Sequence, residues 1–182
     1  NLDGFNEAEK VADNELPELE RWVLHRLSNL DDLVRKTTAE YDFHTMFIEL
    51  HNFCALDMSA FYLDIRKDAL YCDAPSSLRR RAARTVMDRV FDCLVRWLAP
   101  VLCLTADEAW RARYGADSSV HSETFNTVSD GWKDDALAEK WAKIRKLRRV
   151  VTGALELERA EKRIGASLDA APKVYAAAES ME

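Results

Sequence analysis

The longest regular pattern of apolar residues in the chain lies between Phe43 and Asp73 and predicts one long helix. Apolar side chains recur there at spacings of three or four residues, which places them on one stripe of a helix. The stripe contains Phe43, Phe47, Leu50, Cys54, Met58, Phe61 and Ile65. Further apolar residues widen the buried arc, so we expect a central helix with other helices packed around it. Its polar residues then need partners on neighbouring helices, and they are Asn52, Asp57, Ser59 and Asp64.

Helical periodicity recurs on both sides of this stretch. Asp42 can cap the long helix, and Pro100 ends the helix before it. Thr105 and Glu108 have the spacing of a capping box, and Gly165 suits the position after a helix end. The expected helices cover residues 17–41, 43–73, 78–98, 105–115 and 132–165.

These elements predict an all-α fold, a bundle of about four long helices plus a short helix. Residues 1–16 are an acidic lead-in, residues 17–165 the bundle, and residues 166–182 the start of a further region. Leu168–Tyr175 could begin a short strand near the C-terminus, although Pro172 disfavours it.

Composition agrees with a helical globular protein, since only 5 Gly and 4 Pro occur in 182 residues. No apolar run approaches the roughly 20 residues that a membrane span needs, and no signal-peptide pattern opens the chain. We therefore expect a cytoplasmic protein with no membrane partner. None of the four cysteines forms a Cys-x-x-Cys pair, which argues against a zinc site. We expect all of them to be reduced thiols in the core, namely Cys54, Cys72, Cys93 and Cys103.

The net charge of −6 is unevenly distributed along the chain. Residues 1–20 hold seven acids and one lysine, whereas residues 79–96 and 140–163 are strongly basic. Basic helix faces attract phosphates, and arginine can also stack on unpaired bases, although charge runs are commonly solvated faces with ion pairs. The candidate RNA-binding residues are Arg79, Arg80, Arg81, Arg84, Lys143, Arg145, Lys146, Arg148 and Arg149.

Motifs for catalysis and metal binding are missing from the sequence. The four histidines form no Glu-x-x-His or His-Glu-x-x-His motif, and no phosphate-binding glycine loop occurs. Cys54 lies in an apolar helix, which is the environment of an inert thiol. We expect no catalytic residue, metal ligand or cofactor in this chain.

One stretch also carries a family resemblance. Residues 52–86 read NFCALDMSAFYLDIRKDALYCDAPSSLRRRAARTV, and shorter echoes around them read LERWVLHRL, LAPVLCLTADEAW and RIGASLDA. In order and spacing these segments resemble the anticodon-binding domain of bacterial isoleucyl-tRNA synthetases, which are class I aminoacyl-tRNA synthetases. The resemblance extends along almost the whole chain.

The resemblance implies that the chain is an excised, non-catalytic part of a ligase that joins isoleucine to its tRNA using ATP and magnesium. The HIGH and KMSKS signatures of the catalytic domain do not occur here. The implied partners are the anticodon stem and loop of isoleucine tRNA and the catalytic domain of the same polypeptide. Leu104 and Ala69 depart from the family pattern, and Ala69 stands where arginine is common, which puts an RNA contact there in doubt.

Three alternatives remain open at this point. The chain could be a helical protein-interaction scaffold, the equivalent domain of a valyl- or leucyl-tRNA synthetase, or, with the least support, a cofactor-binding bundle enzyme. The family has an arginine-rich helix before the segment that resembles residues 1–11. If that helix is missing, the long central helix loses part of its cover, and we expect the fragment to self-associate.

Overall fold

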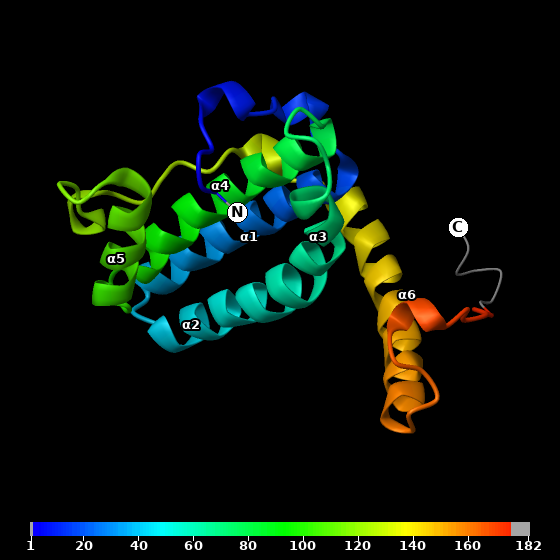
Figure 1. The fold of residues 1–182 in the computed structure, drawn as a ribbon. Coiled ribbons are helices and arrows are strands. Elements are labelled where there is room, and N and C mark those ends of the chain that lie inside the picture. Colours follow the sequence, from blue (N-terminus) through cyan, green and yellow to red (C-terminus); the bar gives the residue numbers. More distant parts are fainter. Residues whose placement is uncertain (1, 176–182) are drawn as a thin grey trace. The chain divides into compact units, whose positions relative to one another are not determined.

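A computed structural model describes residues 2–175 and confirms the all-α prediction (Figure 1). The α-helices are α1 (Glu18–Ala39), α2 (Phe43–Asn52), α3 (Asp64–Tyr71), α4 (Leu78–Leu98), α5 (Cys103–Tyr114) and α6 (Asp135–Ala160). A π-helix, η3 (Phe53–Leu63), joins α2 to α3. Short 3-10 helices are η1 (Glu7–Glu9), η2 (Asp13–Glu15), η4 (Val120–Ser122), η5 (Asp130–Trp132) and η6 (Ser167–Asp169).

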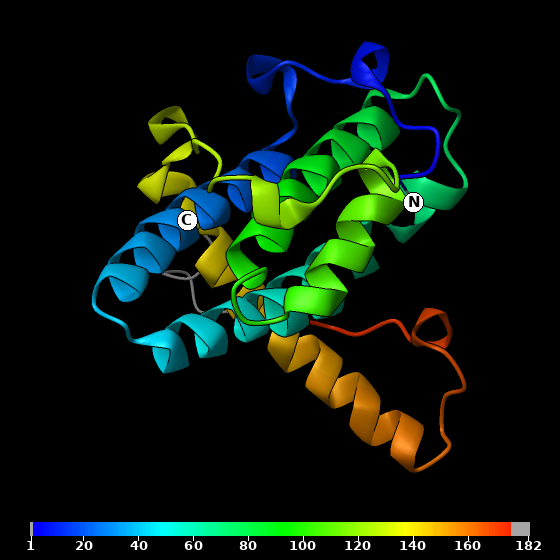
Figure 2. The same cartoon turned by 90° about the vertical axis from the view of Figure 1, so that its left-hand side faces the viewer.

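The chain divides into two compact units, Asn1–Lys133 and Asp134–Glu182. In the first unit, α1 contacts both α2 and α4, while α4 also contacts α3 and α5 (Figures 1 and 2). The apolar face of α1 supplies much of the core, because Val23, Leu27 and Val34 are completely buried. The helix predicted at residues 17–41 is therefore confirmed.

No helix among residues 2–175 has the length and apolar character of a membrane span.

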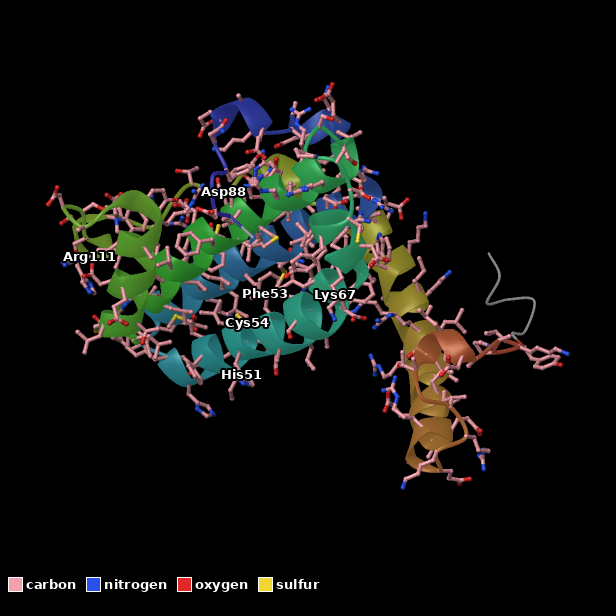
Figure 3. The ribbon with its side chains drawn as sticks, viewed as in Figure 1. His51, Phe53, Cys54, Lys67, Asp88 and Arg111 are labelled. Carbon is pink, nitrogen blue, oxygen red and sulfur yellow. The ribbon has the colours of Figure 1, made fainter. Side chains whose placement is uncertain are left out.

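The long helix is continuous from Phe43 to Tyr71, but its middle is wound as a π-helix. Its buried side follows Met46 and Leu50 in α2, then Phe53, Asp57 and Phe61 in the π segment. Figure 3 shows Phe53 directed into the bundle and His51 on the outer side of the helix. The wider turn of a π-helix therefore keeps a different set of residues inward than an α-helix would.

The predicted stripe is wrong at both ends. Phe43, Phe47 and Ile65 are 43%, 42% and 38% exposed, so the long helix is not covered all round. Of its predicted polar core residues, Asp57 is buried and paired, whereas Asn52, Ser59 and Asp64 are exposed. The 3.6-residue period used for the prediction does not hold through eleven π-helical residues.

Some of the helix ends predicted from the sequence are correct and others are wrong. Asp42 caps α2 by accepting from the amide of Thr45, as predicted. The capping box at Thr105 is wrong, because α5 already begins at Cys103. Tyr41, which follows α1, lies in the left-handed region at φ 60°, although glycine is the residue that fits there best.

Two cysteine predictions also need correction. All four cysteines are free, as expected, but Cys72 and Cys103 are exposed rather than in the core. Both lie at helix boundaries, where the chain turns toward solvent. Cys93 is buried, and Cys54 is half-buried.

The second unit contains α6 and the chain that follows it. The predicted stop at Gly165 is wrong, because α6 ends at Ala160 and Lys162 takes the left-handed conformation at φ 58°. The amide of Arg163 then donates to the carbonyl oxygen of Glu158, which closes the helix end. Residues 168–175 form no strand, since η6 is followed by exposed, irregular chain. The expected frayed end at residues 176–182 lies outside the described residues.

Candidate nucleic-acid interface

Two of the predicted RNA-binding arginines hold the N-terminal segment, residues 2–16, against α4. Arg81 donates to the carbonyl oxygens of Glu9 and Lys10 at 3.1 and 3.3 Å. Arg84 pairs with the Glu9 carboxylate at 2.5 Å and donates to the carbonyl oxygen of Asp3 at 2.7 Å. The acids of the N-terminal segment therefore neutralise part of this basic run.

The same segment is also packed into the first unit by apolar contacts. Phe5 is 5% exposed, and the guanidinium carbons of Arg84 and Arg113 lie 5.2 and 5.8 Å from the centre of its ring. These distances fit cation–π contacts. The buried amide of Val11 donates to the hydroxyl of Thr85. Residues 2–16 are thus an integral part of the first unit.

Asp13 ties the far end of the segment to the last residues of the same unit. Its carboxylate accepts a 2.7 Å hydrogen bond from the indole nitrogen of Trp132 and pairs with Arg89 at 2.5 Å. The Arg89 guanidinium also lies 5.2 Å from the Trp132 ring. Two acids from the segment, Glu9 and Asp13, therefore bind two different arginines of α4.

Arg79 and Arg80 bind the turn that precedes α4. Arg79 donates two hydrogen bonds to the Asp73 carboxylate, at 2.6 and 2.8 Å, and Arg80 donates to the Asp73 carbonyl oxygen at 2.8 Å. The Arg79 guanidinium holds the pKa of Asp73 below its ordinary value. The side chain of Arg79 is still 53% exposed, so it remains open to a polyanion.

The second predicted cluster lies on α6. Lys143, Lys146 and Arg149 are three residues apart and exposed, which places them along one side of this helix. Among the described residues none of these three side chains has a hydrogen bond or ion pair. We call them the α6 surface. Arg145 and Arg148 are half-buried and have interactions of their own.

A further exposed cation, Lys67, was not among the predicted site residues (Figure 3). Within residues 2–175 it makes no hydrogen bond or ion pair. It lines a hollow of about 290 Å³, which we call the α3 surface, together with Ser59, Leu63, Asp64, Leu70 and Tyr71. The spacing of Lys67 and Tyr71, one helical turn apart, was the available sequence signal. Ala69, where the resemblance puts an RNA contact in doubt, is only 2% exposed and is not among the residues that line this hollow.

Buried ion pairs fix the long helix against α1. Glu20 is completely buried and accepts two 2.6 Å hydrogen bonds from Arg66 and one of 3.1 Å from the hydroxyl of Tyr62. Burial raises the pKa of Tyr62 well above its ordinary value, so it stays a donor. Arg26 donates to Asp57, which is 5% exposed, at 2.9 Å.

The larger hollow of the first unit, about 620 Å³, has a different character. Its walls include Met87, Phe91, Ala109 and Ala112, and its basic residue Arg113 is already paired with Asp88 at 2.8 Å. Phosphate groups need available cations, so this apolar hollow does not suit RNA. No group of three or more His, Cys, Asp or Glu side chains within the described residues could hold a metal ion.

Known proteins with similar sequences are tRNA ligases. Residues 20–175 match the family model described as the anticodon-binding domain of tRNA ligase. The chain is 56% identical over 176 residues to an isoleucine–tRNA ligase of Brucella abortus, covering 97% of this chain and 18% of that protein. It is 57% identical over 169 residues to that of Agrobacterium fabrum, covering 93% and 18%. The chain thus spans about a fifth of the length of these relatives, and it belongs to the anticodon-binding domain family of tRNA ligases.

Proposed function

We propose that this chain is the part of an isoleucine–tRNA ligase that binds the anticodon stem and loop of isoleucine tRNA. The observation that carries the proposal is the identity of 56% over 97% of the chain to a protein of that name. The remainder of such a polypeptide would join isoleucine to the tRNA with ATP and magnesium in the cytoplasm. This chain supplies RNA binding and no catalytic group.

The exposed cations support a specific assignment of RNA contacts. Lys143, Lys146 and Arg149 on the α6 surface, and Lys67 on the α3 surface, present ammonium and guanidinium groups with no intramolecular partner among the described residues. Such groups gain the most from phosphates, since counterion release drives binding and no existing pair has to break. Each of the two surfaces is proposed to contact RNA.

The α4 arginines take a different part in the proposal. Arg81 and Arg84 already bind the N-terminal segment, so their role is to hold that segment in place. Arg79 is half-exposed and can bind a phosphate while it keeps Asp73. Arg80, Arg145 and Arg148 are half-buried, and we assign them supporting positions rather than primary phosphate contacts.

Base recognition is proposed to fall to the α3 surface. Its volume is close to the lower limit for small-ligand pockets, and its rim offers the ring of Tyr71, the hydroxyl of Ser59 and the carboxylate of Asp64. Unpaired bases of RNA loops are commonly stacked on aromatic rings and bonded through their edges. Lys67 beside them would hold the adjoining phosphate.

Titration of an RNA hairpin with the anticodon stem and loop of isoleucine tRNA tests the proposal. The double variant Lys143→Glu/Lys146→Glu should weaken binding and lower the salt slope by about 0.7 to 0.9 for each phosphate that the variant no longer neutralises. The control Lys36→Glu/Lys173→Glu makes the same charge change at two exposed positions outside both surfaces. Equal reductions in affinity in both variants, or no binding by the native chain, would contradict the proposal.

A protein-interaction scaffold is the second candidate function. The hollow of about 620 Å³ in the first unit favours it, because its apolar wall residues, Met87 and Phe91 among them, suit contact with protein side chains. The hairpin titration separates the two candidates. A scaffold with no RNA role would bind the hairpin and a scrambled hairpin equally weakly.

A further inference from the structure

The eleven-residue π-helix is the feature of the long helix that its packing alone does not require. π-helical geometry is rare, usually limited to a single turn, and frequent at functional sites. Here it occupies Phe53–Leu63, between two ordinary helices. Its position directly before Lys67 makes its winding relevant to the α3 surface.

Winding of the π segment decides which side of α3 faces solvent. An α-helix turns about 100° per residue, and a π-helix turns less, so eleven π-helical residues rotate α3 by roughly half a turn relative to an all-α helix. In the observed winding, Ala69 and Leu70 are buried whereas Lys67 and Tyr71 are exposed. A full α-helix would turn Lys67 toward the bundle.

Two buried ion pairs hold this winding in register with α1. Arg26 binds Asp57 within the π segment, and Glu20 binds Arg66 three residues after its end. The carboxylates are 5% and 0% exposed. Both α1 residues lie on one rigid helix, so together they fix the rotation of the long helix at two points, one within the π segment and one just beyond it.

We infer that Asp57 and Glu20 are positioning residues for RNA binding: through the π-helical segment they fix the rotation of α3 that presents Lys67 and Tyr71. This inference rests on the proposed function. A residue that only stabilises the fold would not affect RNA binding through one particular cation. In the positioning role, the effect of Asp57 on RNA affinity acts through Lys67.

A positioning role of Asp57 and a purely electrostatic effect of its charge predict opposite changes in RNA affinity. Asp57→Asn removes a negative charge, so by electrostatics alone it should leave affinity for a polyanion unchanged or raise it. If Asp57 positions Lys67, Asp57→Asn should instead lower affinity for the anticodon hairpin as far as Lys67→Ala does. The salt slope should fall by the same amount, about 0.7 to 0.9 for one phosphate.

The double variant Asp57→Asn/Lys67→Ala completes the test. We expect no further reduction of affinity in it, because residues that act through one contact are not additive. Asp57→Glu keeps the carboxylate and should retain near-native affinity. If Asp57→Asn proves unfolded by circular dichroism, Arg26→Lys takes its place, since it keeps the charge of the pair and removes only the guanidinium geometry.

Each negative outcome has its own meaning. Native or tighter binding by folded Asp57→Asn, or reductions that add in the double variant, would overturn the positioning role while leaving RNA binding intact. Absence of hairpin binding by the native chain would overturn the proposed function instead. A readout without RNA tests the structural part of the inference separately: NMR structures of native chain and variant should show residues 53–63 rewound toward α only in the variant, and unchanged winding in the variant would overturn it.

Discussion

Asp107 accepts a 2.6 Å hydrogen bond from the hydroxyl of Ser119, and this contact docks the loop after α5 onto that helix. The amide of Val120, a buried residue of the loop, donates to the same carboxylate oxygen at 3.2 Å. The Asp107 carboxylate is one of several groups that dock the loop, beside the hydrogen bond from the Trp110 indole nitrogen to Ser118 and the burial of Val120.

The first prediction concerns pH. The Ser119 hydrogen bond lowers the pKa of Asp107 below the ordinary value of an aspartate, so the folded state favours its ionised form. Its contribution to stability is present above that ordinary pKa and disappears as pH falls through the lowered pKa. Urea unfolding between pH 6 and 2.5 should show a smaller decrease of stability on acidification for Asp107→Asn than for the native chain. Parallel pH profiles would contradict it.

The second prediction concerns the N-terminal segment. Arg84→Met should loosen the first part of the N-terminal segment, residues 2–10, because it removes the Glu9 pair and the hydrogen bond to Asp3. We expect a decrease of about 1.5 to 3 kcal/mol in the free energy of unfolding, the range for hydrogen bonds to charged groups. Trypsin should then cleave after Lys10 faster than in the native chain. Lys36→Met, at an exposed lysine of α1, is the control and should change neither measurement.

The third prediction concerns the thiols. Burial raises the pKa of Cys93 to about 12, so it should resist alkylation at pH 8, where it carries almost no thiolate. Cys72 and Cys103 are exposed and should react first. Mass spectrometry of iodoacetamide-treated protein measures this order. Early modification of Cys93 in folded protein would contradict it.

The fourth prediction concerns association. Phe43, Phe47 and Ile48 leave about two-fifths of their surface exposed on α2, which supports the expected self-association at high concentration. Phe47→Ser should shift the weight-average mass in sedimentation equilibrium toward the monomer. A native chain that is monomeric at all concentrations would contradict it.

Much of the fold could be predicted from the sequence, because local signals decide where helices begin and end. Asp42 caps α2, and α4 ends just before Pro100, as expected. The inward side of the long helix could not be predicted, since its π-helical middle is stabilised by Arg26 and Glu20 on another helix.

The candidate site could also be predicted only in part. The sequence predicts the cations on α6, because they lie in a run of basic residues. The partners of Arg81 and Arg84 were not, because Glu9 lies more than 70 residues away along the chain. Lys67 could not be predicted from the charge pattern, because Asp64 and Asp68 balance the charges of Arg66 and Lys67 and no basic run appears there. Lys67 is exposed whereas nearby Ala69 and Leu70 are buried, and this difference follows from the winding of the helix.

The hydrogen bond between Trp132 and Asp13 has a consequence for synthesis, since 119 positions separate the two residues. A ribosome that adds roughly 5 to 20 residues per second needs on the order of 6 to 24 seconds to pass from one to the other. During that interval α1 through α5 can assemble, while Asp13 still lacks its indole partner. Asp13 thus completes its contacts only after residue 132 has been translated, although its other partner, Arg89, is made much earlier.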